Sequence, residues 1–337
     1  MAQIGYNISN RIKGGGYMTF SSKTKNEISK LSIDKNCCVL AELSALIHMS
    51  GSIFLNGEKK LGFKIATENA SIARRVFSLL KQRFQTETEV MVRKNHQLKK
   101  NNIYIMIVSA EMGAEDILKQ VGIIQRNEAG NKEINYGIPD GLIQEECCRR
   151  SYIRGAFLGG GSISDPEKTY HLEFVTYSQE HAKGLCKLIN SYELSAKIVQ
   201  RKNSYVVYIK EGEQIVDLLN VIQAHKALLD LENIRIYKEM RNNVNRIVNC
   251  ETANLSKTVN AALRHIENIQ YIKKHIGFRK LPTNLKEVAE LRLNYQDASL
   301  KELGEMLDPP VGKSGINHRL RKLDKIAEDL KIKRGEL

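Results

Sequence analysis

The sequence predicts an α+β protein in which one unit occurs twice and is followed by an all-helical C-terminal domain. The duplication is read directly, because NCCVLAELSALIHMSGSI (36–53) matches ECCRRSYIRGAFLGGGSI (146–163) at a constant offset of 110 residues. A fixed period of this kind indicates two copies of one structural unit. From about residue 214 onward, by contrast, apolar residues recur at helical spacing.

The order of elements within each copy follows from the change in apolar periodicity. FKIATENASIARRVFSLLK (63–81) resembles LEFVTYSQEHAKGLCKLIN (172–190), and in both segments alternating apolar residues give way to helical spacing. Further on, Arg-Lys-Asn at 93–95 recurs at 201–203. We therefore predict helix, strand pair, helix and strand pair in each repeat, with the repeats spanning residues 18–125 and 126–230.

The glycines of IRGAFLGGGSIS (153–164) could belong to a phosphate-binding loop or to a closely packed helix. No Lys-Ser/Thr pair follows them, and their spacing is not GxGxxG. Small residues at 155 and 159–161 instead predict that two equivalent helices approach closely across a pseudo-twofold axis. The Gly-Ser pair that ends each of these segments predicts a helix stop leading into a strand.

Residues 43–51 and 153–161 resemble degenerate copies of the LAGLIDADG motif, which forms the two central helices in the homing-endonuclease family of that name. The resemblance implies that both helices pack at the symmetry axis, that the sheets form a saddle over DNA, and that an acidic residue ends each helix to hold a metal. Ser50 and Gly160 match those acidic positions here. A hydroxyl and a hydrogen atom cannot replace two carboxylates, so we expect no nuclease activity and no metal there. An endonuclease with substituted ligands is the enzymatic alternative.

The charge balance predicts a polyanionic partner. Lysine and arginine number 52 against 38 aspartates and glutamates, which gives a net charge of +14. No apolar run approaches membrane-spanning length, and we expect a cytoplasmic protein with no membrane partner. Several basic residues on or beside the predicted strands are candidate phosphate contacts, with solvated hairpin tips as the alternative interpretation. They are Arg93, Lys94, Lys99, Lys100, Arg201 and Lys202.

Six cysteines in 337 residues are too few for a disulfide scaffold, and they predict reduced core thiols. A structural zinc site built from the two Cys-Cys pairs is the alternative interpretation. Adjacent residues rarely ligate one ion together, so we expect no metal and no cofactor.

A helical linker is predicted over residues 231–280, with a break inside it. RNNVNRIVNCETANLSK (241–257) is rich in asparagine, which favours caps and turns, and we expect a break or capped corner near 249–254. After Pro282, Asn284 and Glu287 have the spacing of a capping box and predict the start of a new helix.

Residues 281–332 are predicted to form three short helices. Ser299 and Glu302 form a second capping box, Asp308-Pro309-Pro310 ends that helix, and a third helix spans 313–323 with Ile316, Leu320 and Leu323 on one edge. The other edge of the third helix is basic and polar and contains no acidic residue, which is typical of a recognition helix in a DNA major groove. Its candidate DNA-binding residues are Lys313, Ser314, Asn317, His318, Arg319, Arg321 and Lys322. A small helical bundle with a charged solvent face is the alternative.

A duplicated LAGLIDADG-like domain without acids, the stretch NRIVNCETAN (245–254) and a C-terminal helix-turn-helix together resemble the WhiA family of bacterial DNA-binding regulators. The resemblance covers nearly all of residues 18–332. It implies a transcription factor of sporulation in actinomycetes and a role in cell division and chromosome segregation in Firmicutes. Residues 1–17 lack periodicity, and we expect a disordered extension before Met18.

The leading hypothesis is a non-enzymatic, nucleoid-associated protein that binds double-stranded DNA. We expect residues 255–337 to retain most of the affinity, while residues 18–230 bind weakly and lose binding at modest salt concentration. A third interpretation makes the repeat domain an adaptor for another regulator or for RNA polymerase.

Overall fold

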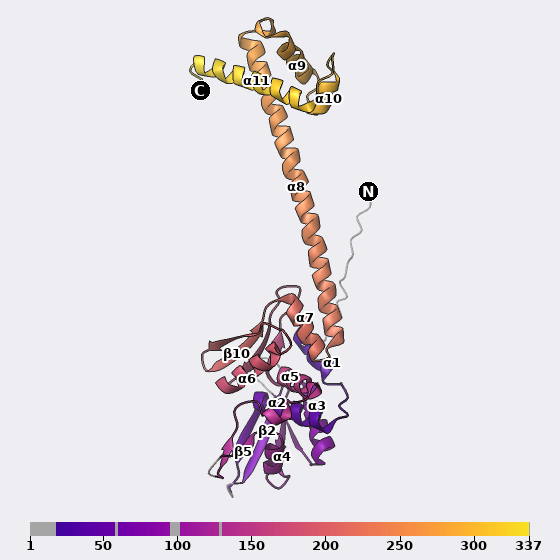
Figure 1. Ribbon diagram of the computed structural model, residues 1–337, viewed down its shortest axis with the longest axis vertical. Helices are drawn as coiled ribbons and strands as arrows, with labels where there is room; N and C mark the ends of the chain where they lie inside the picture. The colour runs from indigo at the N-terminus through magenta and orange to yellow at the C-terminus, as the bar shows by residue number, and fades with distance from the viewer. Residues whose placement is uncertain (1–17, 58–59, 95–101, 128–129, 337) are drawn as a thin grey trace. The chain divides into compact units, whose positions relative to one another are not determined.

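The computed structural model describes residues 18–57, 60–94, 102–127 and 130–336, and these form two compact units that meet in sequence between Lys238 and Glu239 (Figure 1). The expected extension at residues 1–17 lies outside the described residues. Among the helices that the structure describes, none combines the length and apolar character needed to span a bilayer.

The first unit contains the predicted repeat, with the same order of elements in both copies. The first copy comprises α2 (Asn36–Ser50), β1 (Gly51–Leu55), β2 (Leu61–Thr67), α3 (Ala70–Phe84), β3 (Glu89–Lys94), β4 (Asn102–Val108) and α4 (Ala114–Gln120). The second comprises α5 (Glu146–Gly160), β7 (Gly161–Ile163), β8 (Leu172–Thr176), α6 (Gln179–Asn190), β9 (Lys197–Arg201), β10 (Ser204–Ile209) and α7 (Gly212–Val221). Outside the two copies lie α1 (Phe20–Ile28), β5 (Ile124–Arg126), β6 (Lys132–Ile134) and a 3₁₀ turn at Asp140–Leu142.

The two four-stranded sheets have equivalent topology, which confirms the duplication. Their strand orders are β1-β2-β4-β3 and β7-β8-β10-β9, and all neighbouring strands are antiparallel. Gly51 and Gly161 end α2 and α5 and begin β1 and β7, as the Gly-Ser pairs predicted. The apolar side chains of both copies join in one core.

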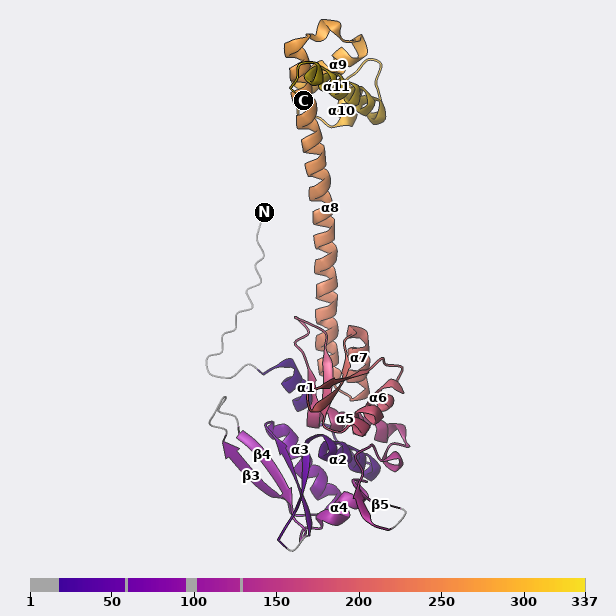
Figure 2. The same ribbon diagram turned by 90° about the vertical axis from the view of Figure 1, so that its left-hand side faces the viewer.

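Helices α2 and α5 lie side by side (Figure 2), and the residues that face each other show that they run in the same direction. A Cβ atom added at Gly155 would meet Ala45, and one added at Gly159 would meet Met49, so residues 110 apart face each other across the axis. The predicted close approach is therefore confirmed for these two glycines. Gly161 differs, because an added Cβ there would meet Phe157 of its own helix.

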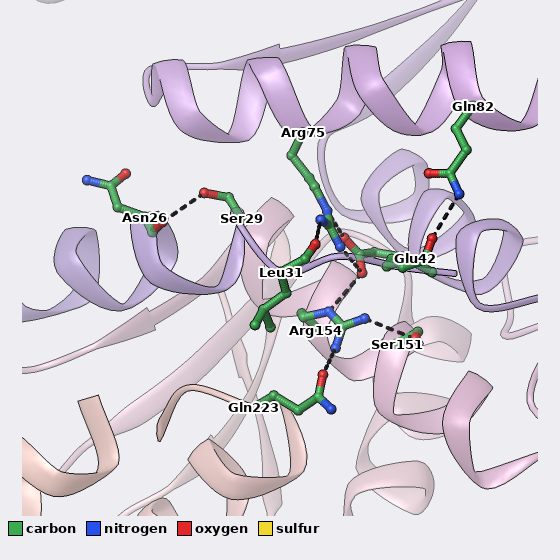
Figure 3. Close-up of polar contacts among 10 residues, drawn as sticks. Asn26, Ser29, Leu31, Glu42, Arg75, Gln82, Ser151, Arg154 and Gln223 are labelled. Carbon is green, nitrogen blue, oxygen red and sulfur yellow. Dashed lines mark hydrogen bonds and ion pairs between the residues drawn. The ribbon is translucent and has the colours of Figure 1, made fainter. Parts of the chain in front are cut away.

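A buried ionic network crosses the α2–α5 interface (Figure 3). The Glu42 carboxylate is fully buried and accepts hydrogen bonds from Arg75 Nε at 2.7 Å and from Arg154 Nε at 2.8 Å. Arg154 also donates to Gln223 Oε1 at 2.7 Å and to Ser151 Oγ at 3.1 Å. One carboxylate thus links α2 to α3 and to α5, and the remaining guanidinium donors find other acceptors.

Helix α8 (His225–His275) is continuous across the boundary between the units, so the predicted break near 249–254 is wrong. Asparagine lowers helix propensity by only a few tenths of a kcal/mol per residue, which a long run of helical hydrogen bonds outweighs. The second unit contains the rest of α8, a 3₁₀ turn at Phe278–Lys280, α9 (Thr283–Asn294), α10 (Leu300–Glu305) and α11 (Lys313–Lys333). These helices share a separate apolar core.

Candidate nucleic-acid interface

Helix α11 is positioned by one apolar edge. Ile316, Leu320 and Leu323 are buried in the core of the second unit, as their spacing predicted, and Ala327 continues the same edge. The helix is longer than the predicted 313–323, because this periodicity extends for two further turns before the helix ends at Lys333.

The turn before α11 is held against α10. Ser299 caps α10 in the predicted capping box, in which its side chain accepts from the Glu302 amide and the Glu302 carboxylate accepts from the Ser299 amide. Val311 N–H donates to Gly304 O at 2.9 Å, and a Cβ atom at Gly304 would collide with the carbonyl oxygen of Val311. Glycine at 304 therefore allows the turn to cross directly over α10, which sets where α11 begins.

Helix α9 begins differently from the prediction. Its N-cap is Pro282, which makes no side-chain cap hydrogen bond, and Asn284 lies inside the helix, so the predicted Asn284–Glu287 capping box is wrong. The Pro282 carbonyl oxygen accepts from the amides of Leu285 at 2.9 Å and Lys286 at 3.0 Å, so the helix begins on a backbone acceptor without a polar side-chain cap. At the other end, the buried Arg292 donates through Nη1 to Ala298 O at 2.7 Å and ties α9 to the segment before α10.

A buried carboxylate that sequence reasoning missed fixes α11 on the end of α8. Asp324 accepts from Asn268 Nδ2 at 2.9 Å and lies 3.3 Å from Arg264 and 3.5 Å from His265. Burial lowers the pKa of His265, and the Asp324 carboxylate opposes that shift. The sequence signal was the first acidic residue after the basic run, but the partners of Asp324 lie more than fifty positions away in the sequence.

The outward face of α11 is basic. Ser314, His318, Arg321 and Lys322 are exposed, and so is Lys313 at the first helical position. Ser314, His318 and Arg321 recur at spacings of four and three, which places them in one stripe opposite Ile316 and Leu320.

Two predicted residues lie on the flanks of this stripe. Asn317 and Arg319 are half-buried, and Arg319 Nη1 makes a long contact of 3.5 Å with Asn284 O of α9. Lys325 is exposed one turn beyond Arg321 and extends the stripe. The prediction omitted Lys325 because the expected helix ended at residue 323, before Lys325, whereas α11 continues to Lys333.

The positive charges in and beside this stripe have no acidic partner among the residues that the structure describes. Within the part of the chain that the structure describes, no ion pair involves Lys313, Arg319, Arg321 or Lys322. Gly312 caps α11 without a side-chain hydrogen bond, so the first-turn amides add the positive end of the helix dipole. Exposed cations beside free helix amides suit phosphate contacts, while His318 and Arg321 suit the edges of bases.

In the repeat domain, Ser50 and Gly160 stand at the ends of α2 and α5 and supply no carboxylate there. Ser50 Oγ donates to Leu46 O at 2.9 Å, and a Cβ atom at Gly160 would meet the Met49 side chain and the Val175 carbonyl. Asp165 accepts from the Glu167 amide in the turn after β7. The donor set at these helix ends lacks the carboxylates that a nuclease metal needs, so it does not fit that ion.

The predicted secondary contacts are dispersed. Arg93 and Lys94 are exposed at the end of β3, and Lys202 lies in the β9–β10 turn with a left-handed φ of 50°. Arg201 Nη1 lies 3.3 Å from Glu173 Oε2, which partly neutralises it. Lys99 and Lys100 lie outside the described residues.

The prediction of core thiols holds for two of the six cysteines. Cys38 and Cys148 are buried, whereas Cys37 and Cys250 are exposed and Cys147 and Cys186 are intermediate.

Comparisons with known proteins agree with this architecture. Three family models match in order: the WhiA N-terminal LAGLIDADG-like domain at residues 36–124, the WhiA LAGLIDADG-like domain at 149–241 and the WhiA C-terminal HTH domain at 244–327. The chain is 60% identical over 311 residues to the "Probable cell division protein WhiA" of Alkaliphilus metalliredigens, covering 92% of this chain and 98% of that protein. It is 60% identical over 315 residues to the protein of the same name from Clostridium botulinum, covering 93% and 99%.

A solved structure resembles this chain over most of its length. The crystal structure of full-length DUF199/WhiA from Thermatoga maritima is 27% identical, with a TM-score of 0.58, and covers 92% of this chain and 98% of its own. Together with the duplicated sheets and the C-terminal helix-turn-helix, these matches show that the chain belongs to the WhiA family.

Proposed function

We propose that this protein is a non-enzymatic, sequence-specific DNA-binding protein that regulates transcription and serves cell division and chromosome segregation. The observation that carries the proposal is the exposed basic stripe of α11, whose cations have no acidic partner among the described residues. The other side of this helix is held in place by its buried apolar edge and by Asp324. A rigid helix with such a face fits the major groove of double-stranded DNA. The names of the relatives support the part concerning cell division.

Single substitutions in the stripe test the DNA-binding surface. Arg321→Ala is expected to weaken binding by about 1–3 kcal/mol if Arg321 reads a base, and to reduce the salt dependence if it contacts a phosphate. Lys333→Ala is the matched control, because it removes one positive charge from the far end of the same helix. Mobility-shift affinities that are equal for wild type and Arg321→Ala would contradict the proposal.

Mapping of genome occupancy tests the biological role. We expect binding at discrete sites near genes of cell division and segregation, together with a fluorescent fusion that is cytoplasmic and follows the nucleoid. Uniform occupancy without preferred sites would contradict a transcription regulator and support an organiser of DNA.

The nuclease alternative requires carboxylates that the helix ends at Ser50 and Gly160 lack. We expect supercoiled DNA to remain intact in the presence of magnesium or manganese. Cleavage that is abolished by substitutions near Ser50 or Gly160 would establish the enzyme instead.

Exposed apolar side chains on the edge strands favour a second role for the repeat domain. Val90 and Val92 of β3 are 49% and 52% exposed, and Ile198 of β9 is 39% exposed. An edge strand with exposed apolar residues can pair with an extended segment of another protein. Another regulator or RNA polymerase is the proposed partner class, and retention of such a protein by residues 18–238 in the absence of DNA tests it.

A further inference from the structure

Four cysteines meet at the beginning of the two central helices of the repeat domain. Cys37 and Cys38 open α2, and Cys147 and Cys148 open α5. The four Sγ atoms all lie within 4.8 Å of one another. We call these residues the four-cysteine cluster; it lies at the helix ends opposite to Ser50 and Gly160.

The pseudo-twofold packing explains how two adjacent pairs can converge. Successive residues of one helix point in different directions, so adjacent cysteines of one helix rarely bind one ion together, yet here both thiols of each pair lie within 4.8 Å of both thiols of the other pair. Here the parallel helices bring equivalent pairs together, and each contributes one buried thiol, Cys38 or Cys148, and one more accessible thiol, Cys37 or Cys147. The objection to adjacent cysteines as ligands therefore does not apply to a site shared between two helices.

The electrostatic surroundings suit thiolates that are bound to a cation. The cluster occupies the first turns of α2 and α5, and neither helix has a side-chain cap, so two sets of helix amides are available to negative sulfur. A hydrogen bond with Cys38 and the nearby Lys35 lower the pKa of Cys147. Burial raises the pKa of Cys38 to about 11 and also raises that of Cys148.

We propose that the four-cysteine cluster binds one zinc ion in tetrahedral thiolate coordination and thereby joins the starts of α2 and α5. A zinc–sulfur distance of about 2.3 Å places tetrahedral sulfur atoms about 3.8 Å apart, which small side-chain rotations reach from the observed spacing. Binding replaces four S–H protons with four Zn–S bonds, so up to four protons are released and the site carries two negative charges. No oxidant or reductant takes part, and the site is independent of DNA binding.

The test measures metal content and coordination in the full-length protein. The protein is expressed with zinc supplied and is purified under reducing conditions without chelator. We expect one zinc ion per chain by elemental mass spectrometry. Replacement by cobalt should produce the thiolate-to-cobalt charge-transfer band and the d–d bands of a tetrahedral four-sulfur site.

Paired variants show which cysteines are ligands. Cys37→Ser combined with Cys147→Ser should lose the stoichiometric metal, while Cys186→Ser combined with Cys250→Ser should retain it, since these two residues lie outside the cluster. Wild-type protein that binds neither zinc nor cobalt would overturn the proposal. So would retention of the metal by the first variant, or a Cys37–Cys147 disulfide recovered from reducing cells. If the first variant does not fold, the cobalt spectrum of wild type decides, because nitrogen or oxygen ligation would overturn the assignment.

Discussion

Glu42 places a single carboxylate between the guanidinium groups of Arg75 and Arg154 inside the repeat domain, where removal of its charge would leave two buried cations without an anion (Figure 3). Breaking a buried pair in this way costs about 3–5 kcal/mol. We expect Glu42→Gln to lower the free energy of unfolding by this amount, measured by chemical denaturation. Glu115→Gln is the control, because Glu115 likewise lies between two basic side chains, Lys119 and Lys132, but is partly exposed. Loss of the Glu115 charge should cost at most about 1 kcal/mol. Equal costs for both variants would show that the Glu42 network adds nothing beyond a surface ion pair.

His181 is expected to make the repeat domain sensitive to acid. Burial and the stacked ring of His48, with centroids 5.0 Å apart, lower the pKa of His181 to about 3, and its Nε2 is hydrogen-bonded to Tyr152 Oη at 2.8 Å. The unfolded chain takes up a proton near pH 6.5 while the native state does not, so stability is full above that pH and is lost as the pH falls toward 3. The loss from pH 7.5 to pH 5 is about 2 kcal/mol for this group.

Denaturation across this pH range measures the effect. His181→Phe keeps an aromatic ring beside His48 but cannot titrate, so the slope of stability against pH should decrease, whatever the absolute stability of the variant. An unchanged slope would assign the acid sensitivity to other groups.

The α2–α5 pair is the element on which the repeat domain depends, and Gly155 tests how closely it packs. A Cβ atom at Gly155 would lie 2.9 Å from Ala45 Cβ and would also meet the Glu42 carbonyl. Helix propensity alone favours alanine over glycine by about 1 kcal/mol, but overpacking costs about 1–3 kcal/mol. We expect Gly155→Ala to be destabilising in thermal denaturation, whereas Gly141→Ala, where an added Cβ meets nothing within 4 Å, should be neutral. A stabilised Gly155→Ala protein would contradict the close approach.

At the scale of elements, local signals were predicted well and long-range polar partners were not. The 110-residue offset and the change from alternating to helical spacing yielded both repeats and their strand pairs, because these patterns reflect burial along a continuous stretch. The Ser299 capping box was predicted for the same reason, since it involves neighbouring residues. The break predicted from the asparagines of α8 was wrong, because the weak preference of asparagine for caps and turns does not end a long helix. Partners such as Glu42 and Arg154, or Asp324 and Asn268, depend on tertiary packing that no local pattern records.

For the whole molecule, the two units differ in how their positive charge is distributed. The basic side chains of the repeat domain are divided between separate strands, and Arg201 is paired with Glu173. In the second unit, Lys313, Arg321 and Lys322 occupy the first turns of one helix without acidic partners among the described residues. Dense phosphate contacts release more counterions, and affinity and salt dependence increase with their number.

We therefore expect a fragment of residues 239–337, which has its own apolar core, to retain most of the DNA affinity of the full chain. This fragment replaces the one expected from residue 255, because the second compact unit begins at Glu239. Residues 18–238 should bind weakly and lose binding at modest salt concentration, since few of their cations act together. Titration of both fragments on the same duplex at two salt concentrations measures the difference, and full-length protein is the reference. Tighter or less salt-sensitive binding by residues 18–238 would mean that the sheets of the repeat domain are the DNA-reading surface and that α11 has the secondary role.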